Sequence, residues 1–511
     1  MSVQVRVVGD LPWTIKADVL VVPIVGAPVF DGPLGELDRR TGGELSALQA
    51  FGEIRERQFT SAISAPGGLP AGRVVTVSVG EAEAIDRETV LRTGAAAIHR
   101  LAGRHANTVA IWIAPLVAAL GGDVKTVSNL VARGVVEGTF EPKHIYRAAD
   151  EARTAPPEIT ELILVTGDME SDHSAAKTAA ERGVIVGEGT NLARSLANRS
   201  ANDVTPEVLA EEAWSLAEKH GLWIDVIGPD KATELGMGMF MAVGKGSDNA
   251  PRMIVMRSGK AGEKDALGRH LAIVGKGVCF DSGGISIKPS DRMEEMKMDK
   301  AGACSVIAAI ATLARLAPGT PLLALAPAVE NMPGSHSTRP GDIVTALNGK
   351  KVDIINTDAE GRLILGDALT YAERLGATHL VDVATLTGLV SRALGDQVAG
   401  AFGTPDSWRD TVIAAGTAAG ERYWPLPLVE DYRVEMDSWY GDVTNSGSAD
   451  GSLVKSALFI REFTTMPWVH LDIAGTGYYR KTKPYAPRGA TGSAHATLVE
   501  LALAGAAPSG D

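Results

Sequence analysis

The sequence predicts an α/β protein of two domains, in which a smaller N-terminal α/β domain precedes a larger C-terminal α/β domain with a mostly parallel central sheet. Three observations lead to this prediction. The chain has 511 residues, which is more than one hydrophobic core usually organises. Short β-branched runs alternate with helical patterns along most of its length. Polar residues interrupt that alternation at residues 166–177, and we place the boundary near residue 170.

The composition is that of a folded protein without a strongly basic surface. Hydrophobic residues make up 45% of the chain and charged residues 22%, and the net charge is −13. Because nucleic acids and anionic membranes are bound by clustered Lys and Arg, this charge argues against both as general partners. Only Cys279 and Cys304 are present, so a disulfide framework is excluded and both thiols are expected in the core.

Nothing in the sequence predicts secretion or membrane insertion. The first residues, MSVQVRVVGDLPW, lack a basic segment followed by an apolar one. The most apolar stretch, residues 109–122, is shorter than the roughly 20 residues that cross a bilayer. We therefore expect a cytoplasmic protein.

The first part, residues 1–170, shows strand-like runs and helical stretches but no catalytic spacing. The predicted strands are the runs VQVRVV, VLVVPIV, RVVTVSV, VAIWIA and ELILVT, and the clearest helix is RETVLRTGAAAIHRLAGR. We assign this domain a structural or assembly role.

The second part, residues 171–511, continues the alternation of strands and helices, and charged residues follow several of its predicted strands. Strands are predicted at 270–278, 321–330, 351–357, 378–385 and 468–475. Helical patterns at 299–317 and 361–376 lie between them, so we expect a largely parallel sheet covered on both faces. Ligands of such sheets bind beyond the carboxyl ends of the strands.

Charged residues follow two of these strands and begin one helix. Lys276, Asp281 and Lys288 come with and after the first strand. Asp358, Glu360 and Arg362 follow the third, and Asp299 stands at the predicted start of a helix. We expect all of them at one edge of one sheet.

Four carboxylates in one pocket would need cations. Each close pair repels by about 4 kcal/mol at an effective dielectric near 20. Carboxylate oxygens with one nitrogen donor suit zinc, manganese or magnesium, and four acids are enough to bridge two ions about 3.5 to 4 Å apart.

Each of these residues taken alone has a simpler interpretation. Asp299 could cap its helix, Asp358 and Glu360 could interact with a helix dipole, and Asp281 could stabilise a turn. The basic residues could be solvated or paired surface groups. Their joint placement favours a shared site.

Several motifs together resemble the leucyl aminopeptidase (cytosol aminopeptidase) family of dizinc exopeptidases. They are VGKGVCFDSGGISIKPS, MKMDKAGA, ENMPGSHSTRPGDIV, NTDAEGRLILGDAL and DVATLTG. The resemblance covers residues 190–500 in order, whereas the N-terminal part matches only in length and pattern. It implies that residues 171–511 form a dimetal peptidase catalytic domain.

The resemblance also implies a role for each charged residue. The metal ligands would be Lys276, Asp281, Asp299, Asp358 and Glu360. Lys288 and Arg362 would be catalytic, and Arg362 would hold a bicarbonate ion that acts as general base. The cofactors would be two divalent ions per subunit, Zn²⁺ or Mn²⁺, with Mg²⁺ or Co²⁺ as alternatives at one site.

The implied reaction is release of N-terminal amino acids, with leucine and other apolar residues favoured, from peptides with a free N-terminus. A metal-bridging hydroxide would attack the first peptide carbonyl, and Lys288 would stabilise the oxyanion. Lys276, Asp281, Lys288 and Asp358 would contact the substrate. Met296 and the turn from Thr385 to Gly388 would line the first side-chain pocket, although Met296 could equally be core packing.

Other functions have weaker support in the sequence. GKG lacks the Ser or Thr of a phosphate-binding loop, and neither G-x-S-x-G nor HExxH occurs. A DNA-binding or assembly protein on the same fold remains an alternative, because function need not follow fold. The resemblance implies a homohexamer of two stacked trimers.

Overall fold

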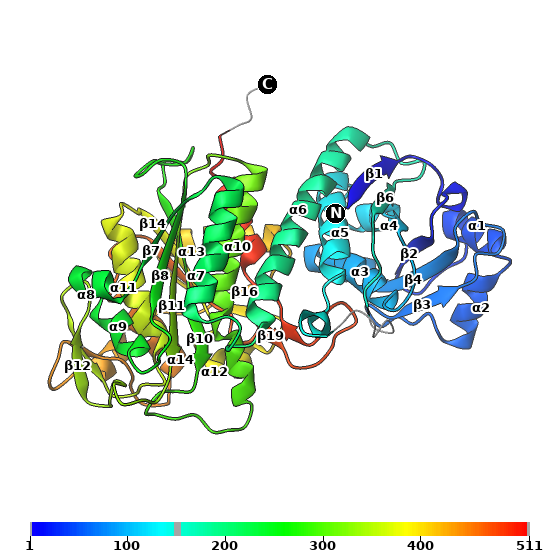
Figure 1. Ribbon diagram of the computed structural model, residues 1–511. Coiled ribbons are helices and arrows are strands. Elements are labelled where there is room, and N and C mark those ends of the chain that lie inside the picture. Colours follow the sequence, from blue (N-terminus) through cyan, green and yellow to red (C-terminus); the bar gives the residue numbers. More distant parts are fainter. Residues whose placement is uncertain (1–2, 148–154, 508–511) are drawn as a thin grey trace. The chain divides into compact units, whose positions relative to one another are not determined.

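The protein is described here by a computed structural model that covers residues 3–147 and 155–507. The chain divides into two compact units (Figure 1). Unit 1 comprises Met1–Asn191 and Arg480–Arg488, and unit 2 comprises Leu192–Tyr479 and Gly489–Asp511. The division falls inside one long helix, α6 (His173–Asn198). A functional boundary near residue 170 stays a prediction.

Unit 1 is built on a six-stranded sheet in the order β1-β6-β5-β2-β4-β3, in which only β3 is antiparallel to its neighbour. The strands are β1 (Gln4–Val8), β2 (Val19–Val25), β3 (Ser61–Ser64), β4 (Arg73–Gly80), β5 (Thr108–Trp112) and β6 (Glu161–Val165). All five runs predicted as strands are therefore confirmed. The sixth strand, β3, carries only the short segment SAIS and was missed.

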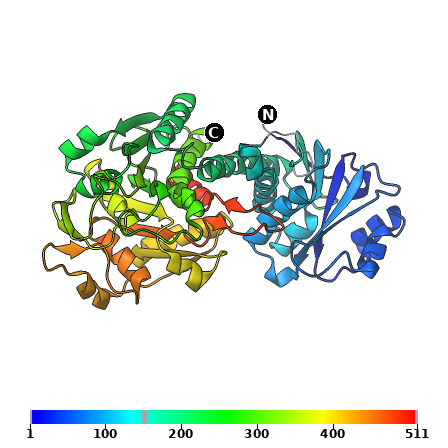
Figure 2. The same ribbon diagram turned by 60° about the horizontal axis from the view of Figure 1, so that its bottom comes forward.

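Helices cover both faces of this sheet (Figures 1 and 2). They are α1 (Gly32–Arg40), α2 (Glu44–Phe51), α3 (Arg87–Arg100), α4 (Ala114–Ala119), α5 (Val124–Gly138) and α6. Successive residues of a strand point to opposite faces: Val19 and Val21 pack in the core under α3 and α5, whereas Leu20 and Val22 pack with residues of α1 and α2. The continuous β-branched runs are explained by burial on both faces.

Unit 2 contains a mixed, mostly parallel central sheet in the order β16-β15-β18-β14-β9-β11-β8-β7, with β10 paired to β11. Its strands are β7 (Trp223–Ile227), β8 (Arg252–Ser258), β9 (Leu271–Gly275), β10 (Gly277–Asp281), β11 (Leu322–Asn331), β14 (His379–Ala384), β15 (Ala399–Thr404), β16 (Tyr423–Pro425) and β18 (Trp468–Asp472). Strands β9, β11, β14 and β18 run parallel at the centre.

Two layers of helices enclose the central sheet. One face is covered by α7 (Pro206–His220), α10 (Ala301–Leu316), α13 (Asp406–Ala418) and α15 (His495–Leu503). The other is covered by α9 (Gly238–Gly244), α11 (Gly361–Arg374) and α14 (Ser452–Arg461). The short helices α8 (Pro229–Leu235) and α12 (Gly388–Leu394) lie outside these layers.

Two predictions about the strands of unit 2 were wrong. The segment 270–278 is not one strand, because Lys276 separates β9 from β10. The predicted third strand, β13 (Lys351–Ile354), lies outside the central sheet and pairs with β12 (Asp342–Thr345) and β17 (Val443–Thr444). The acidic segment after β13 therefore enters from a separate sheet.

Asp299 lies in a 3₁₀ segment, η4 (Met293–Lys300), that runs directly into α10. The helix predicted over 299–317 is thus confirmed with a start two residues later. Cys279 and Cys304 are buried, as expected for core thiols, and burial raises the pKa of Cys304 to about 12. Among the described residues, no helix is long and apolar enough to span a membrane.

Candidate metal and catalytic site

Lys276 is the buried centre of one half of the site. Its backbone is fixed between strands, since its N–H donates to the Val383 carbonyl at 2.9 Å. The side chain is only 3% exposed. Its Nζ lies 2.9 Å from Asp299 Oδ2 and 2.7 Å from Glu360 Oε1, and it donates to the Thr385 carbonyl at 3.2 Å. One amine therefore joins residues from η4, the start of α11 and the end of β14.

Lys288 has the corresponding position in the other half. Its Nζ lies 2.8 Å from Asp281 Oδ2 and 2.5 Å from Asp358 Oδ1. This half is partly open, because the Lys288 side chain is 21% exposed and that of Asp358 is 33% exposed. The acidic centre is therefore exposed to solvent on this side.

The two halves share one acidic centre. Asp281, Asp358 and Glu360 each present a carboxylate oxygen within 4.8 Å of the other two. The structure thus brings together the predicted lysines and acids. Asp281 ends a strand of the central sheet, Asp299 lies in η4, and Asp358 and Glu360 follow a strand of a separate sheet. The structure does not place all of them at one sheet edge, as we had expected.

Among the simpler interpretations of the acids, the structure contradicts the helix cap at Asp299. Asp299 makes no helix cap; its Oδ1 accepts a hydrogen bond from Thr385 Oγ1 at 2.7 Å. Glu360 occupies the N-cap of α11 without a side-chain cap bond. Asp281 does stabilise a turn, because its Oδ1 accepts the Gly283 N–H at 2.9 Å. Its other oxygen remains directed to Lys288.

Burial and neighbouring charges shift the pKa values of the acids of the site. Burial raises the pKa of Asp299 to about 7 and that of Asp358 to about 6, and nearby carboxylates add to both shifts. Burial and the Glu360 carboxylate also raise the pKa of Asp281. For Lys276, burial lowers the pKa, but Asp299 and Glu360 outweigh it and the net shift is upward.

Two buried carboxylate oxygens of the site face only the lysine ammonium groups. Asp299 Oδ2 and Asp358 Oδ1 face ammonium groups, yet neither makes a hydrogen bond of acceptable geometry within the described residues. Carboxylate oxygens gathered in this way are the donor set that divalent cations prefer. The residues present therefore fit divalent metal ions.

Arg362 lies near the acids without pairing to them. Its Nη1 donates to the Asn445 carbonyl at 2.8 Å, whereas its buried Nε has no partner among the described residues. Burial lowers the pKa of this guanidinium to about 10, against the opposing charges of Glu360, Asp472 and Asp358. This buried N–H is a donor that a bound anion would satisfy.

The predicted substrate-pocket residues differ in how the structure places them. Thr385 belongs to the cluster through its bonds to Lys276 and Asp299. Met296 is half-buried in η4, three residues before Asp299, and no described contact joins it to the cluster. Gly388 is exposed at the first position of α12.

Sequence reasoning missed two residues that organise this site. Asn331, the last residue of β11, donates from its side-chain amide to Asp281 Oδ1 at 2.8 Å. Asp472, the last residue of β18, accepts from Thr387 Oγ1 at 2.6 Å. The signal that could have found them is position, since both are polar residues at the carboxyl end of a buried strand.

Comparison with known proteins finds similarity over nearly the whole chain. The sequence model described as "Cytosol aminopeptidase family, catalytic domain" matches residues 191–499, and that of the family's N-terminal domain matches residues 21–146. A "Probable cytosol aminopeptidase" of Solibacter usitatus (strain Ellin6076) is 42% identical over 492 residues, covering 96% of this chain and 97% of the relative. One from Roseiflexus castenholzii (strain DSM 13941 / HLO8) is 38% identical and covers 96% of both chains.

Two solved structures are also similar over nearly the full length. A mutant of tomato leucine aminopeptidase has a TM-score of 0.86 and 30% identity, covering 98% of this chain and 96% of the other. The bottromycin maturation enzyme BotP in complex with Mn has a TM-score of 0.79 and 32% identity, covering 96% and 99%.

Proposed function

The chain belongs to the cytosol aminopeptidase family of metal-dependent aminopeptidases, and from this premise we propose which residues hold the metals and carry the reaction. The enzyme is a metallo-exopeptidase of the hydrolase class. The observation that carries the proposal is the meeting of Asp281, Asp358 and Glu360 between the buried Lys276 and the partly exposed Lys288.

Two divalent ions would bind in the acidic centre, Zn²⁺ or Mn²⁺, with Mg²⁺ or Co²⁺ as alternatives at one position. Lys276, Asp281, Asp299, Asp358 and Glu360 would be their ligands. A Mn-bound similar structure and the close approach of the Asp281, Asp358 and Glu360 carboxylates support this assignment. When bound, the ions supply Lewis acidity and an activated water nucleophile at neutral pH.

Lys276 can act as a ligand only as the neutral amine. Without metal it is an ammonium held by two carboxylates, so metal binding must release its proton. A nearby dication together with burial makes that release favourable. Binding of the ions should therefore be weaker at lower pH.

Lys288 would act on the substrate carbonyl. Its ammonium lies at the open side of the site and points between Asp281 and Asp358. A donor fixed in this way stabilises the negative charge that develops on the carbonyl oxygen, an effect worth about 3 to 4 kcal/mol.

Arg362 would hold a bicarbonate ion. Its buried Nε has no hydrogen-bond partner within residues 3–147 and 155–507, which supports an anion at this position. Bicarbonate would supply the general base that the described side chains around Lys288 do not offer.

The substrate is a peptide with a free N-terminus, and leucine and other apolar first residues would be favoured. Lys276, Asp281, Lys288 and Asp358 would contact its reacting end. Met296, Thr385 and Gly388 would line the pocket of the first side chain.

We also propose an oligomeric state and a location for the enzyme. The enzyme would form a homohexamer of two stacked trimers in the cytoplasm, with residues 1–170 serving assembly. Large exposed side chains such as Trp439, which is 96% exposed, and Tyr440 support association with other chains.

One experiment tests the reaction. Purified full-length protein should release leucine from leucyl amide, lose that activity in a strong chelator and regain it with Mn²⁺ or Zn²⁺. Metal-free protein that retains DNA in a strongly salt-dependent manner, with no chelator-sensitive peptidase activity, would instead support the DNA-binding alternative.

A further inference from the structure

The side-chain amide of Asn331 joins two loops of the proposed metal site. Asn331 is the last residue of β11 and is buried, with a relative exposure of 4%. Its Nδ2 donates to Asp281 Oδ1 at 2.8 Å and to the Thr357 carbonyl at 3.0 Å. Both protons of one amide are thus used, one on a carboxylate of the site and one on the peptide bond that precedes Asp358.

The backbone carbonyl of Asn331 holds the loop that follows Asp281. Its carbonyl accepts the Ser282 N–H at 3.0 Å and the Ser282 hydroxyl at 2.7 Å. A hydrogen bond also joins the two loops directly, because Thr357 Oγ1 donates to the Gly283 carbonyl at 2.7 Å. Asn331 therefore lies at the junction of β10, β11 and the acidic segment after β13.

These hydrogen bonds fix the orientation of the Asp281 carboxylate. Its Oδ1 is held by the Asn331 amide and the Gly283 N–H, so the carboxylate cannot rotate freely. Its Oδ2 is thereby kept toward Lys288 and the acidic centre. Since the same amide holds the Thr357 carbonyl, it also fixes the spacing between Asp281 and Asp358.

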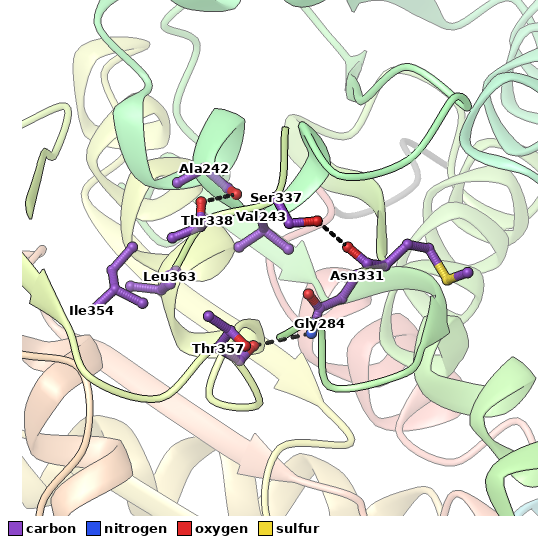
Figure 3. Close-up of a pocket in the computed structure, with 10 residues that line it drawn as sticks. Ala242, Val243, Gly284, Asn331, Ser337, Thr338, Ile354, Thr357 and Leu363 are labelled. Carbon is purple, nitrogen blue, oxygen red and sulfur yellow. Dashed lines mark hydrogen bonds between the residues drawn. The ribbon is translucent and has the colours of Figure 1, made fainter. Parts of the chain in front are cut away.

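Asn331 is packed closely against its neighbours in this arrangement. Figure 3 shows it beside Gly284 and Thr357, lining a small cavity of about 10 Å³, with Thr338 on another wall. A Cβ added at Gly284 would lie 2.7 Å from Asn331 Oδ1. The cavity is about the size of one water molecule, so the amide is confined by packing.

We infer that Asn331 is a positioning residue of the metal site, which holds Asp281 and the peptide before Asp358 in the arrangement that receives the ions. This inference rests on the proposed function. Hydrogen-bond partners of metal-ligating carboxylates typically change metal affinity by 10- to 100-fold when they are removed.

The test compares two substitutions of the same kind at the same cavity. Asn331→Leu keeps the approximate shape and removes both donors. Thr338→Val removes the hydroxyl that donates to the Ala242 carbonyl at 2.5 Å, a bond that touches no proposed ligand. Full-length chains, stripped of metal, are titrated with MnCl₂ by calorimetry, and their melting temperatures are recorded without metal.

We expect the Mn²⁺ dissociation constant of at least one site to rise 10- to 100-fold in Asn331→Leu and to stay within threefold in Thr338→Val. A purely structural role would lower the melting temperature of Asn331→Leu and leave the affinity unchanged. Asn331→Ala carries the same expectation and serves if the leucine variant does not fold.

The outcomes separate this inference from the function on which it rests. If the wild-type chain binds two Mn²⁺ ions and both Asn331 variants bind them within threefold of wild type, only the role of Asn331 is overturned. If the wild-type chain does not bind two ions, the proposed function fails and this inference fails with it.

Discussion

Gly361 and the end of the Lys276 side chain are in direct contact: a Cβ added at Gly361 would lie 2.7 Å from Lys276 Nζ. The first residue of α11 is therefore glycine because an amine occupies the space that a side chain would fill. This contact explains why glycine follows the acids of NTDAEGRL directly. The arginine of the motif, Arg362, comes next on the same helix.

Gly361→Ala should displace the Lys276 amine and lower activity. A displacement of about 1 Å at a catalytic centre can reduce the rate by about 100-fold. Gly366→Ala is the matched control, because its Cβ would meet Met239 and Phe463 one turn further along α11 and not the amine. Steady-state rates on leucyl amide check this, and equal losses in the two variants would contradict it.

Lys276→Met should destabilise the metal-free protein and abolish binding of one ion. The substitution leaves Asp299 and Glu360 buried without their shared cation, and breaking a buried ion pair in this way typically costs about 3 to 5 kcal/mol. Metal content per chain and melting temperature provide the measurement.

A second buried lysine offers the control for that variant. Lys455 is 1% exposed and pairs with Glu435 at 2.6 Å, and it contacts none of the proposed ligands. Lys455→Met should lower the melting temperature and leave two ions bound. A normal metal content in Lys276→Met would show that its amine is not a ligand.

Asp472→Asn should weaken substrate binding through the turn that follows β14. Asp472 accepts from Thr387 Oγ1 at 2.6 Å and from the Ala474 N–H at 3.1 Å, so an amide here loses at least one acceptor. A loss of about 1 to 2 kcal/mol corresponds to a KM roughly 5- to 30-fold higher, with a smaller change in kcat.

Asp382→Asn is the comparison for that substitution. Asp382 is buried in the same sheet and pairs with His470 Nδ1 at 2.5 Å and Trp468 Nε1 at 2.6 Å. It makes no described contact with the turn, so its loss should reduce stability while KM stays near the wild-type value. Equal KM values in both variants would exclude a role of Asp472 in the pocket.

Asp367 should make the stability of the protein depend on pH. It is fully buried and accepts the Phe240 and Leu347 N–H groups at 2.9 and 2.8 Å. Burial raises its pKa to about 7, whereas an unfolded aspartate titrates near 3.9. The folded chain therefore holds a proton that the unfolded chain has lost between about pH 4 and pH 7, and stability from this group falls as pH rises through that window.

Asp367→Asn removes this titration. The variant loses an acceptor at every pH, but it avoids the buried charge above pH 7, so the stability advantage of wild type should shrink from pH 5 to pH 8. The change can reach about 1.4 kcal/mol per pH unit. Urea unfolding at the two pH values measures it, and a constant difference would contradict the assignment.

Much of this fold could be predicted from local pattern. The runs VLVVPIV and RVVTVSV became β2 and β4 almost to the residue, because β-branched residues buried on both faces leave few alternatives. The helix α11 begins at Gly361, where the predicted helical pattern begins. The lysines and acids were found because several unusual residues follow strand ends.

Strand pairing could not be predicted in the same way. The segment KVDI has a strand pattern, but nothing in its residues indicates that it pairs with Asp342–Thr345 and Val443–Thr444 instead of the central sheet. Pairing depends on distant partners and not on local propensity. Asn331 was missed for a related reason, since an amide that donates to two loops has no spacing of its own in the sequence.

The segment Arg480–Arg488 belongs to unit 1 although the chain on both sides of it belongs to unit 2. Its Tyr485 ring packs 5.2 Å from that of Phe59, and the Arg92 guanidinium stacks 4.2 Å from its centre. Cutting the chain once between the family's two domains would therefore expose an aromatic ring and leave a nine-residue loop without its partners. Anyone seeking the peptidase half in isolation should shorten this loop to a tight hairpin between Tyr479 and Gly489, which already pair as strands.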